Sequence, residues 1–429
     1  MQRYFNKRVL SIFFMGFASG LPLGLVGATL QAWYTVSGAS LIAIGWLTLV
    51  GQPYAYKFLW APLLDRFEPF SLGRRRSWII CMQALLVLGL CAMGFLNPAK
   101  NPLFLAFIAL SVAIFSATQD TAIDAYRTEL LEEHERGIGV SASTVAYRIA
   151  MMVSSALALM IASVLSWHSL YFLMAGCFVV LMLITWRSPN PAVSSSPPTS
   201  MRAAMLAPLV NFFSRKHAFY IILFIVLYKL CDAMALSLNT AFLLRVMHFS
   251  LIQIGAISKT VGLTAGLMGS VVGGFLLPYF NLYRSLIIFG FLQLASNLLY
   301  AWLYIVGKNI TIMSIAIFGE NFCSGLATVA FIVFLMQLCD KRYTATQYAL
   351  FSAFASLGRI FIGPVSAVLV DHIGWVDFYI VSSLVGLPAL VIMFFFCTEK
   401  CNWILRYIKC FDASASVTSV CRKSTGLLT

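Results

Sequence analysis

The sequence predicts an all-α integral membrane protein, with twelve transmembrane helices in two pseudo-symmetric six-helix bundles. Hydrophobic residues make up 61% of the 429 residues and charged residues only 10%, whereas a soluble domain carries about 25% charged residues. Apolar runs recur along the chain, and each is near or above the ~20 residues that a tilted helix needs to cross a bilayer. The two halves of the chain also repeat one another.

The apolar runs define twelve candidate spans. Their approximate limits are 9–33, 41–63, 78–96, 102–126, 138–164, 167–186, 218–244, 251–279, 284–306, 311–338, 344–370 and 374–397. The first follows a basic N-terminus and so resembles a signal peptide. Its apolar run continues without a small-residue cleavage site, so we predict that it remains as the first spanning helix.

Lysine and arginine are concentrated in alternate connections between the spans. Only Lys100, Arg245 and Lys308 lie in the loops on the opposite side. Because basic residues accumulate on the cytoplasmic side of membrane proteins, this bias predicts that both termini are cytoplasmic. The bias also accounts for the net charge of +14 without a nucleic-acid partner, for which we find no motif. The protein is therefore expected to contact the lipid bilayer as a multi-pass protein.

An internal repeat divides the chain. The segment LIAIG at 41–45 recurs as LIQIG at 251–255, and Trp33, Arg148 and Trp167 correspond to Phe242, Arg359 and Trp375 at nearly the same offset. Parallel repeats of this kind predict a pseudo-two-fold axis along the membrane normal and a central cavity. We therefore assign residues 1–186 to the N-terminal bundle, 187–216 to a Pro- and Ser-rich cytoplasmic linker, 217–398 to the C-terminal bundle, and 399–429 to a cytoplasmic tail that begins with a short amphipathic helix at 399–411.

The fourth span ends in an acidic and basic segment. Asp120 and Asp124 are four residues apart and Arg127 follows three residues later, so these side chains project from one helical region. A charge facing lipid near the membrane centre costs roughly 2.5–3.5 kcal/mol on insertion scales, so such groups are expected to face a cavity or the protein interior. Glu129 is expected to be solvated at the helix end.

Polar residues inside other spans are further candidates for binding a solute or a proton. These residues are Gln119, Arg148, Lys57, Gln31, Lys229, Asp232, Glu320, Asn321 and Arg359. Two structural alternatives remain open: Lys229 and Asp232 could pair locally, and Lys57 could extend to the cytoplasmic surface. A cavity that holds both acids and bases would suit a large zwitterionic solute, and an embedded carboxylate can carry a coupling proton.

The connection between the second and third spans carries an acid and a cluster of bases. The residues are Asp65, Arg66, Gly73, Arg74 and Arg75. They resemble the D-R-x-G-R-R signature of the major facilitator superfamily, widened by a five-residue insertion. Charge pairing across this loop can stabilise one conformation of the protein and break in another. The alternative is that these residues are only a cluster of cytoplasmic positive charge.

The longer motifs resemble the AmpG muropeptide permeases of Gram-negative inner membranes, a family within the major facilitator superfamily. The motifs are GFASGLP at 16–22, KFLWAPLLDR at 57–66, LGRRR at 72–76, ATQD at 117–120, IDAYRTE at 123–129, YKLCD at 228–232, ENFCSG at 320–325 and TATQYAL at 344–350. The resemblance implies import of GlcNAc-anhydroMurNAc and its peptides for cell-wall recycling, powered by the proton gradient and without a bound cofactor. Only Tyr283-Arg284 remains of the basic signature in the second half, which departs from the pattern.

Other function classes receive less support from the residues. We find no nucleophile–base set, no metal-ligand spacing and no phosphate-binding loop, so neither an enzyme nor an ATP-driven pump is expected, and no metal site. The alternatives that stay open are a paralogous major facilitator carrier of another large anion, such as a siderophore or an acyl-coenzyme A like solute, and a non-transporting membrane sensor. A monomer is expected.

Overall fold

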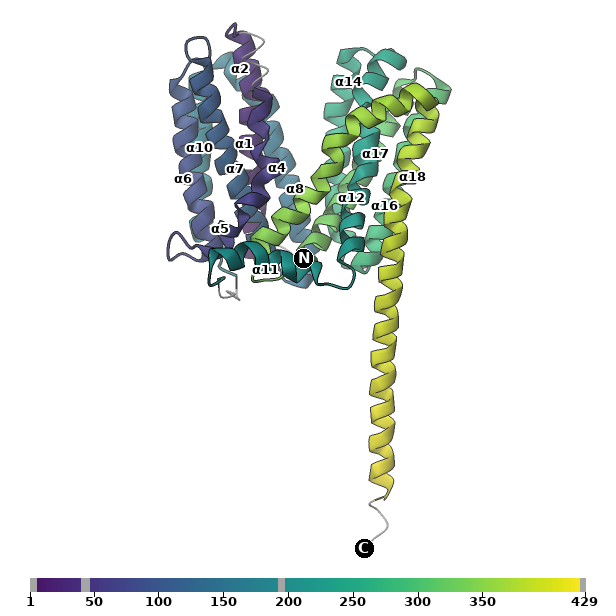
Figure 1. Ribbon diagram of the computed structural model, residues 1–429. Coiled ribbons are helices and arrows are strands. Elements are labelled where there is room, and N and C mark those ends of the chain that lie inside the picture. Colours follow the sequence, from purple (N-terminus) through teal and green to yellow (C-terminus); the bar gives the residue numbers. More distant parts are fainter. Residues whose placement is uncertain (1–5, 40–46, 192–196, 425–429) are drawn as a thin grey trace.

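The structure, a computed structural model, describes residues 6–39, 47–191 and 197–424. Beyond Phe396, and at Thr48, Leu251, Lys259, Leu357 and 359–361, the description is limited to the backbone. The described residues form two helical bundles, which stand side by side and are bridged at one end by helix α11 (Met201–Phe213) (Figure 1). We call this the linker end. The bundles diverge towards the opposite end, which we call the far end.

The N-terminal bundle contains the elements up to α10. They are α1 (Lys7–Gly24), η1 (Leu25–Thr29), α2 (Leu30–Val36), η2 (Leu47–Gly51), α4 (Pro53–Tyr56), η3 (Lys57–Leu59), α5 (Ala61–Arg66), α6 (Arg74–Phe95), α7 (Pro102–Leu130), η4 (Glu133–Glu135), α8 (Arg136–Met152), η5 (Val153–Leu157), α9 (Ala158–Val164) and α10 (Trp167–Arg187). Proline at the first helical position is compatible with helix formation, and α7 begins in this way at Pro102.

The C-terminal bundle contains the elements from α12 onward. They are α12 (Ala218–Ser237), α13 (Asn239–Ala241), η6 (Phe242–Val246), α14 (Leu251–Ile257), η7 (Ser258–Gly262), α15 (Leu263–Leu276), α16 (Leu282–Val306), α17 (Ile310–Leu338) and α18 (Thr344–Ser424). Helix α18 rises from the linker end and turns back at the far end (Figure 1). It turns at Gly374, whose φ of 79° and ψ of 176° lie in a region open only to glycine.

Ten helices among the described residues are long and apolar enough to cross a membrane. Two differences from the twelve predicted spans account for this number. The eleventh and twelfth belong to one continuous element, interrupted at Gly374. The second, predicted at 41–63, is not one helix: its described part from Leu47 consists of η2, α4, η3 and α5. Pro53 and Pro62 stand at the starts of α4 and α5, where each removes a backbone donor that a continuous helix would need.

Two other segments contain more helix than the sequence analysis predicts. The second part of the predicted linker forms the regular helix α11, in which Ser200 Oγ accepts the amide of Ala203 at 3.1 Å and Ala204, Pro208 and Phe212 are buried at helical spacing. Instead of a separate short helix at 399–411, the backbone stays helical through Ser424 as part of α18, and no chain-breaking residue interrupts this stretch.

The predicted repeat is visible in the aromatic packing of both bundles. Trp33 stacks on Trp167 at 5.9 Å and on Tyr171 at 5.2 Å between ring centroids. At the equivalent place in the second half, Phe242 lies 5.0 Å from Trp375 and 5.3 Å from Tyr379. Helix pairs repeat in the same manner, since α1 packs on α8 as α12 packs on α18. The predicted fold class, an all-α membrane protein built from two repeated helical bundles, is thereby confirmed.

Small residues bring the two bundles into close contact at the linker end. Helix α8 of the first bundle packs on α15 of the second. Ser141 Oγ donates a hydrogen bond to the Ser270 carbonyl at 2.8 Å. A Cβ placed on Gly274 would overlap the side chain of Ser141, and one on Gly137 would lie 2.9 Å from the carbonyl oxygen of Gly274. The absence of side chains at these glycines therefore permits the close approach of the bundles.

Candidate functional site

A cavity of about 900 Å³ lies between the bundles, and both halves line it. Helices α1, α7 and α8 contribute from the first half, and α12, α17 and α18 from the second. Its polar lining residues are Ser19, Asp120, Asp124, Arg127, Ser143, Thr144, Tyr147, Arg148, Lys229, Asp232, Ser237, Ser324, Thr328, Tyr348 and Ser356. Small-molecule sites span roughly 300–1,000 Å³, so this cavity has room for a large solute.

The carboxylates of α7 face the cavity as predicted. Asp120 accepts a hydrogen bond from Ser19 Oγ of α1 at 2.5 Å. Asp124 lies between two cations, with Lys57 Nζ at 3.4 Å and Arg127 Nη2 at 2.8 Å. Lys57 therefore turns towards Asp124 rather than to the protein surface, which removes one of the two alternatives left open by the sequence.

Arg127 connects the two halves across the cavity. Its Nη2 also donates a hydrogen bond to the Tyr348 hydroxyl of α18 at 2.8 Å, and its side chain is buried, with 6% exposed. Asp124, Arg127 and Tyr348 thus form a chain from one bundle to the other. A charge-assisted hydrogen bond of this kind is stronger than one between neutral groups.

The second half contributes Lys229 and Asp232 of α12. Lys229 Nζ donates to Thr328 Oγ1 at 3.0 Å and lies 5.3 Å from the centre of the Phe331 ring. Asp232 accepts hydrogen bonds from Gln293 Nε2 at 3.1 Å and from Ser324 Oγ at 3.4 Å. Both side chains line the cavity, as expected.

Several predicted residues lie behind the cavity wall or away from it. Gln119 is buried and donates to the Ala18 carbonyl at 2.9 Å, because consecutive residues of a helix project about 100° apart and it therefore points to a different face of α7 from Asp120. Gln31 is exposed on α2 and does not line the cavity. Glu320 is buried and accepts from Asn321 Nδ2 at 2.7 Å; neither of the two lines the cavity.

One predicted residue has a side chain that the structure does not describe, and three hydroxyl groups of the site were not predicted. The side chain of Arg359 lies outside the described residues, so its predicted role stays a prediction. Sequence reasoning did not select the hydroxyls of Ser19, Thr328 and Tyr348 as site residues. Serine and threonine are common in spanning helices, so only their partners in the folded chain single them out.

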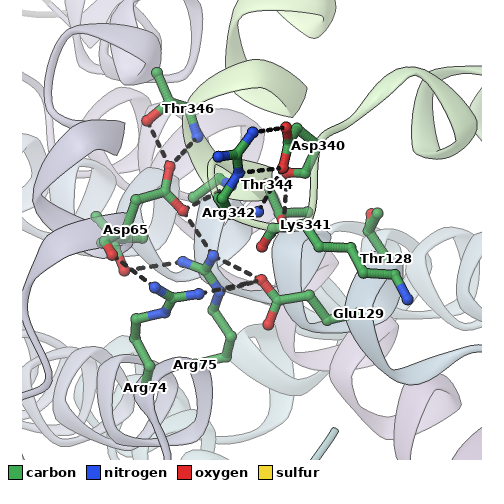
Figure 2. Close-up of polar contacts among 12 residues, drawn as sticks. Asp65, Arg74, Arg75, Thr128, Glu129, Asp340, Lys341, Arg342, Thr344 and Thr346 are labelled. Atoms are coloured by element: carbon green, nitrogen blue, oxygen red, sulfur yellow. Dashed lines mark hydrogen bonds and ion pairs between the residues drawn. The ribbon is translucent and has the colours of Figure 1, made fainter. Parts of the chain in front are cut away.

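A buried network of charged groups closes the linker end (Figure 2). Arg75 Nη2 lies 2.6 Å from Asp65 Oδ1 and 2.7 Å from Glu129 Oε1. Arg74 Nη1 donates to the backbone carbonyl of Asp65 at 2.8 Å. Glu129 is therefore part of this network, with 9% of its side chain exposed, and the expectation that it is solvated was wrong.

Asp65 also caps the first turn of α18 in the other half (Figure 2). Its carboxylate accepts from the amides of Ala345 at 3.2 Å and Thr346 at 2.8 Å, and from Thr346 Oγ1 at 2.6 Å. The N-terminus of a helix carries partial positive charge and unpaired amides, so a carboxylate there is stabilising. Because Asp65 belongs to the first bundle and α18 to the second, the contact holds the linker end closed.

Two predicted lock residues remain, Gly73 and Arg66, and only Gly73 has a clear structural role near the network. Gly73 has a φ of 96° at the start of α6, a backbone conformation that favours glycine, and its amide donates to Glu68 Oε1 at 3.0 Å. Arg66 is not part of the network: its guanidinium carbon lies 5.3 Å from the centre of the Phe67 ring. The aspartate of the signature therefore pairs with Arg75, and the first arginine of the signature, Arg66, lies outside that pair.

Comparisons with known proteins agree with this fold. Residues 12–363 match the model of the Major Facilitator Superfamily. The chain is 42% identical over 96% of its length to the anhydromuropeptide permease of Escherichia coli K12, covering 84% of that protein. It is 31% identical over 91% of its length to a transporter designated AmpG 4 of Rickettsia felis, covering 96% of that protein.

Solved structures share the fold at low sequence identity. A human organic anion transporter superposes with a TM-score of 0.69 at 15% identity, covering 90% of this chain and 99% of the other. The transporter FucP in its outward conformation gives a TM-score of 0.69 at 14% identity, with 90% and 98% covered. The protein belongs to the Major Facilitator Superfamily and is a multi-pass membrane permease rather than an enzyme. Within that superfamily it is a homologue of the anhydromuropeptide permease.

Proposed function

We propose that this protein imports anhydromuropeptides, which are sugars linked to short peptides, across the bacterial inner membrane. The observation that carries the proposal is the cavity of about 900 Å³ whose wall presents both carboxylates and cations from the two halves. A sugar–peptide carries carboxylates, an amine and many hydroxyl groups, and each finds a complementary partner there. The 42% identity to the E. coli permease supports the same substrate class.

The orientation follows from the distribution of charge. Arg74, Arg75, Arg215 and Lys341 belong to the linker end, where loops join α5 to α6 and α17 to α18. Positive residues of short loops remain in the cytoplasm, so the linker end and both termini are cytoplasmic. The closed network around Asp65 then seals the cytoplasmic side, and the described conformation faces the periplasm.

Transport proceeds by alternating access of the central cavity to the two sides. Asp120 and Asp124 are the candidates for carrying the coupling proton, because carboxylates held in a membrane-embedded site mark proton pathways. Protonation of Asp124 would remove its charge-assisted contacts with Lys57 and Arg127. The cavity is formed by a single chain, and a monomer suffices for this cycle.

Uptake into proteoliposomes tests the proposal. Labelled GlcNAc-anhydroMurNAc peptide should accumulate when the lumen is alkaline relative to the outside, and a protonophore should abolish the accumulation. Asp124→Asn should abolish gradient-driven uptake, and its expression level and midpoint of thermal unfolding separate a lost function from a lost fold. Absence of uptake by the wild-type protein, with siderophores or acyl-coenzyme A accepted instead, would identify another large anion as the solute. Unchanged uptake by Asp124→Asn would contradict the role given to that carboxylate.

A further inference from the structure

Most cations around the cavity are already paired inside the protein. Lys57 and Arg127 both contact Asp124, at 3.4 and 2.8 Å. Lys229 donates to Thr328 at 3.0 Å. To bind a solute, each of these side chains would have to break its contact with a protein partner, and the free energy of that contact would be lost.

Arg148 is different from these cations. It lines the cavity, and its guanidinium makes no hydrogen bond and no ion pair within 4.0 Å with any residue that the structure describes. A guanidinium carries five N–H donors in a planar fork. Since the side chain lines the cavity and has no such partner in the described part of the chain, these donors are available to a molecule that enters the cavity.

The structure makes room for this guanidinium at one glycine of the other bundle. Arg148 extends from α8 towards α15, where a Cβ placed on Gly266 would overlap Arg148 Nη1. Glycine at this position therefore provides the space in which the guanidinium lies. The space is built from both halves, since α8 belongs to the first bundle and α15 to the second.

Two acids of the second half balance the charge of Arg148 without occupying its donors. Asp232 and Glu320 attract it electrostatically. Asp232 accepts from Gln293 and Ser324, and Glu320 accepts from Asn321 at 2.7 Å. Their longer-range attraction lowers the cost of holding a cation in a partly buried place, and the cation remains open to a third, external anion.

We infer that Arg148 binds a carboxylate of the transported solute and that Gly266 holds open the position from which it does so. A planar guanidinium matches a carboxylate with two parallel hydrogen bonds, and such pairs are among the strongest in proteins. The peptide part of an anhydromuropeptide supplies carboxylates of this kind. The inference rests on the proposed function, because it names the group of that solute which the site recognises.

The test compares a solute with its neutralised form. Calorimetry on the purified protein in nanodiscs measures the binding of two compounds. One is an anhydromuropeptide with free peptide carboxylates, and the other is the same compound with these carboxylates converted to carboxamides. A charge-assisted hydrogen-bond pair predicts that the wild type prefers the free acid on the order of tenfold to hundredfold. Arg148→Gln should reduce this preference to nearly one, and Arg148→Lys should retain part of it.

A second variant tests the same site without removing the charge. Gly266→Ala should displace the guanidinium and lose most of the preference. Gly255→Ala is the matched control, because a Cβ at Gly255 meets no atom within 4 Å, and it should behave like the wild type. Thermal unfolding of each variant shows whether a lost preference reflects a lost fold or a lost contact. If one variant fails to fold, either Arg148 variant or Gly266→Ala that does fold is enough to test the inference.

The possible outcomes separate this inference from the proposed function. If the wild type binds both compounds and Arg148→Gln keeps the full preference for the free acid, another cation recognises the carboxylate and the inference is overturned, while the proposed function stands. If the wild type binds neither compound, both are overturned. A preference that is lost in Arg148→Gln and Gly266→Ala, and kept in Gly255→Ala, supports the inference.

Discussion

Asp65→Asn should open the linker end of the protein. The substitution keeps the shape of the side chain but removes its charge. The native carboxylate accepts from Arg75 Nη2 at 2.6 Å, from Thr346 Oγ1 at 2.6 Å, and from two amides of α18. An amide cannot replace this set, because one side of it is itself a donor and would face donors.

The size of the effect follows from the burial of the pair. Asp65 is fully buried and Arg75 is 2% exposed. Breaking a buried ion pair by removing one partner costs 3–5 kcal/mol, and Glu129 still neutralises Arg75 at 2.7 Å, so we take about 3 kcal/mol. That value changes the ratio of closed to open linker end by roughly a hundredfold, since each 1.4 kcal/mol is a factor of ten.

Distance measurements by pulsed electron resonance detect this shift. Spin labels at Ser71 and Ser214, which are exposed on opposite halves of the linker end, should show a longer and broader distribution in Asp65→Asn. Asp340→Asn is the control, because the Asp340–Arg342 pair at 2.8 Å is exposed on the arginine side and such pairs contribute little. The Arg342 hydrogen bond holds the pKa of Asp340 below its usual value, so the control also removes a real charge. Identical distributions in Asp65→Asn and the wild type would refute the lock.

Two further substitutions test the glycines that the fold requires. Gly274→Val should prevent closure of the linker end, because its Cβ would overlap Ser141; the labels at Ser71 and Ser214 should then report a permanently open end, and a wild-type distance would disprove the close packing of α8 on α15. Gly374→Ala should lower the midpoint of thermal unfolding by a few degrees, since a φ of 79° costs a residue with a Cβ about 1–3 kcal/mol; an unchanged midpoint would show that the turn can relax.

Sequence reasoning succeeded where the signal is local or periodic. Long apolar runs located the spanning helices, and the spacing of Asp120, Asp124 and Arg127 placed all three on the cavity wall. The matching of Trp33 with Phe242 identified equivalent positions in the two bundles, which the aromatic clusters confirm. In each case the feature is determined within one helix or by a repeated pattern, so it can be predicted from a single sequence.

The unpredicted parts depend on contacts between distant residues. Glu129 looked solvated because nothing near it in the chain shows that Arg75, 54 residues away, would reach it. Likewise, the acid–base loop predicted a lock, but its partner, the first turn of α18, is 281 residues from Asp65. Arg148 could be placed inside a span, yet that it has no hydrogen-bond partner among the described residues is a property of the whole cavity.

The cavity and the lock share two helices, one from each half. Helix α7 carries Asp124 at the cavity and Glu129 in the lock, five residues and therefore roughly 7.5 Å apart along the axis. Helix α18 carries Thr346, which binds Asp65, and Tyr348, which binds Arg127. A rigid helix cannot move one of these residues without the other. Any solute or proton that changes the contacts of Asp124 or Arg127 must therefore act on the lock, and by linkage an opened lock must change the affinity of the cavity by the same free energy.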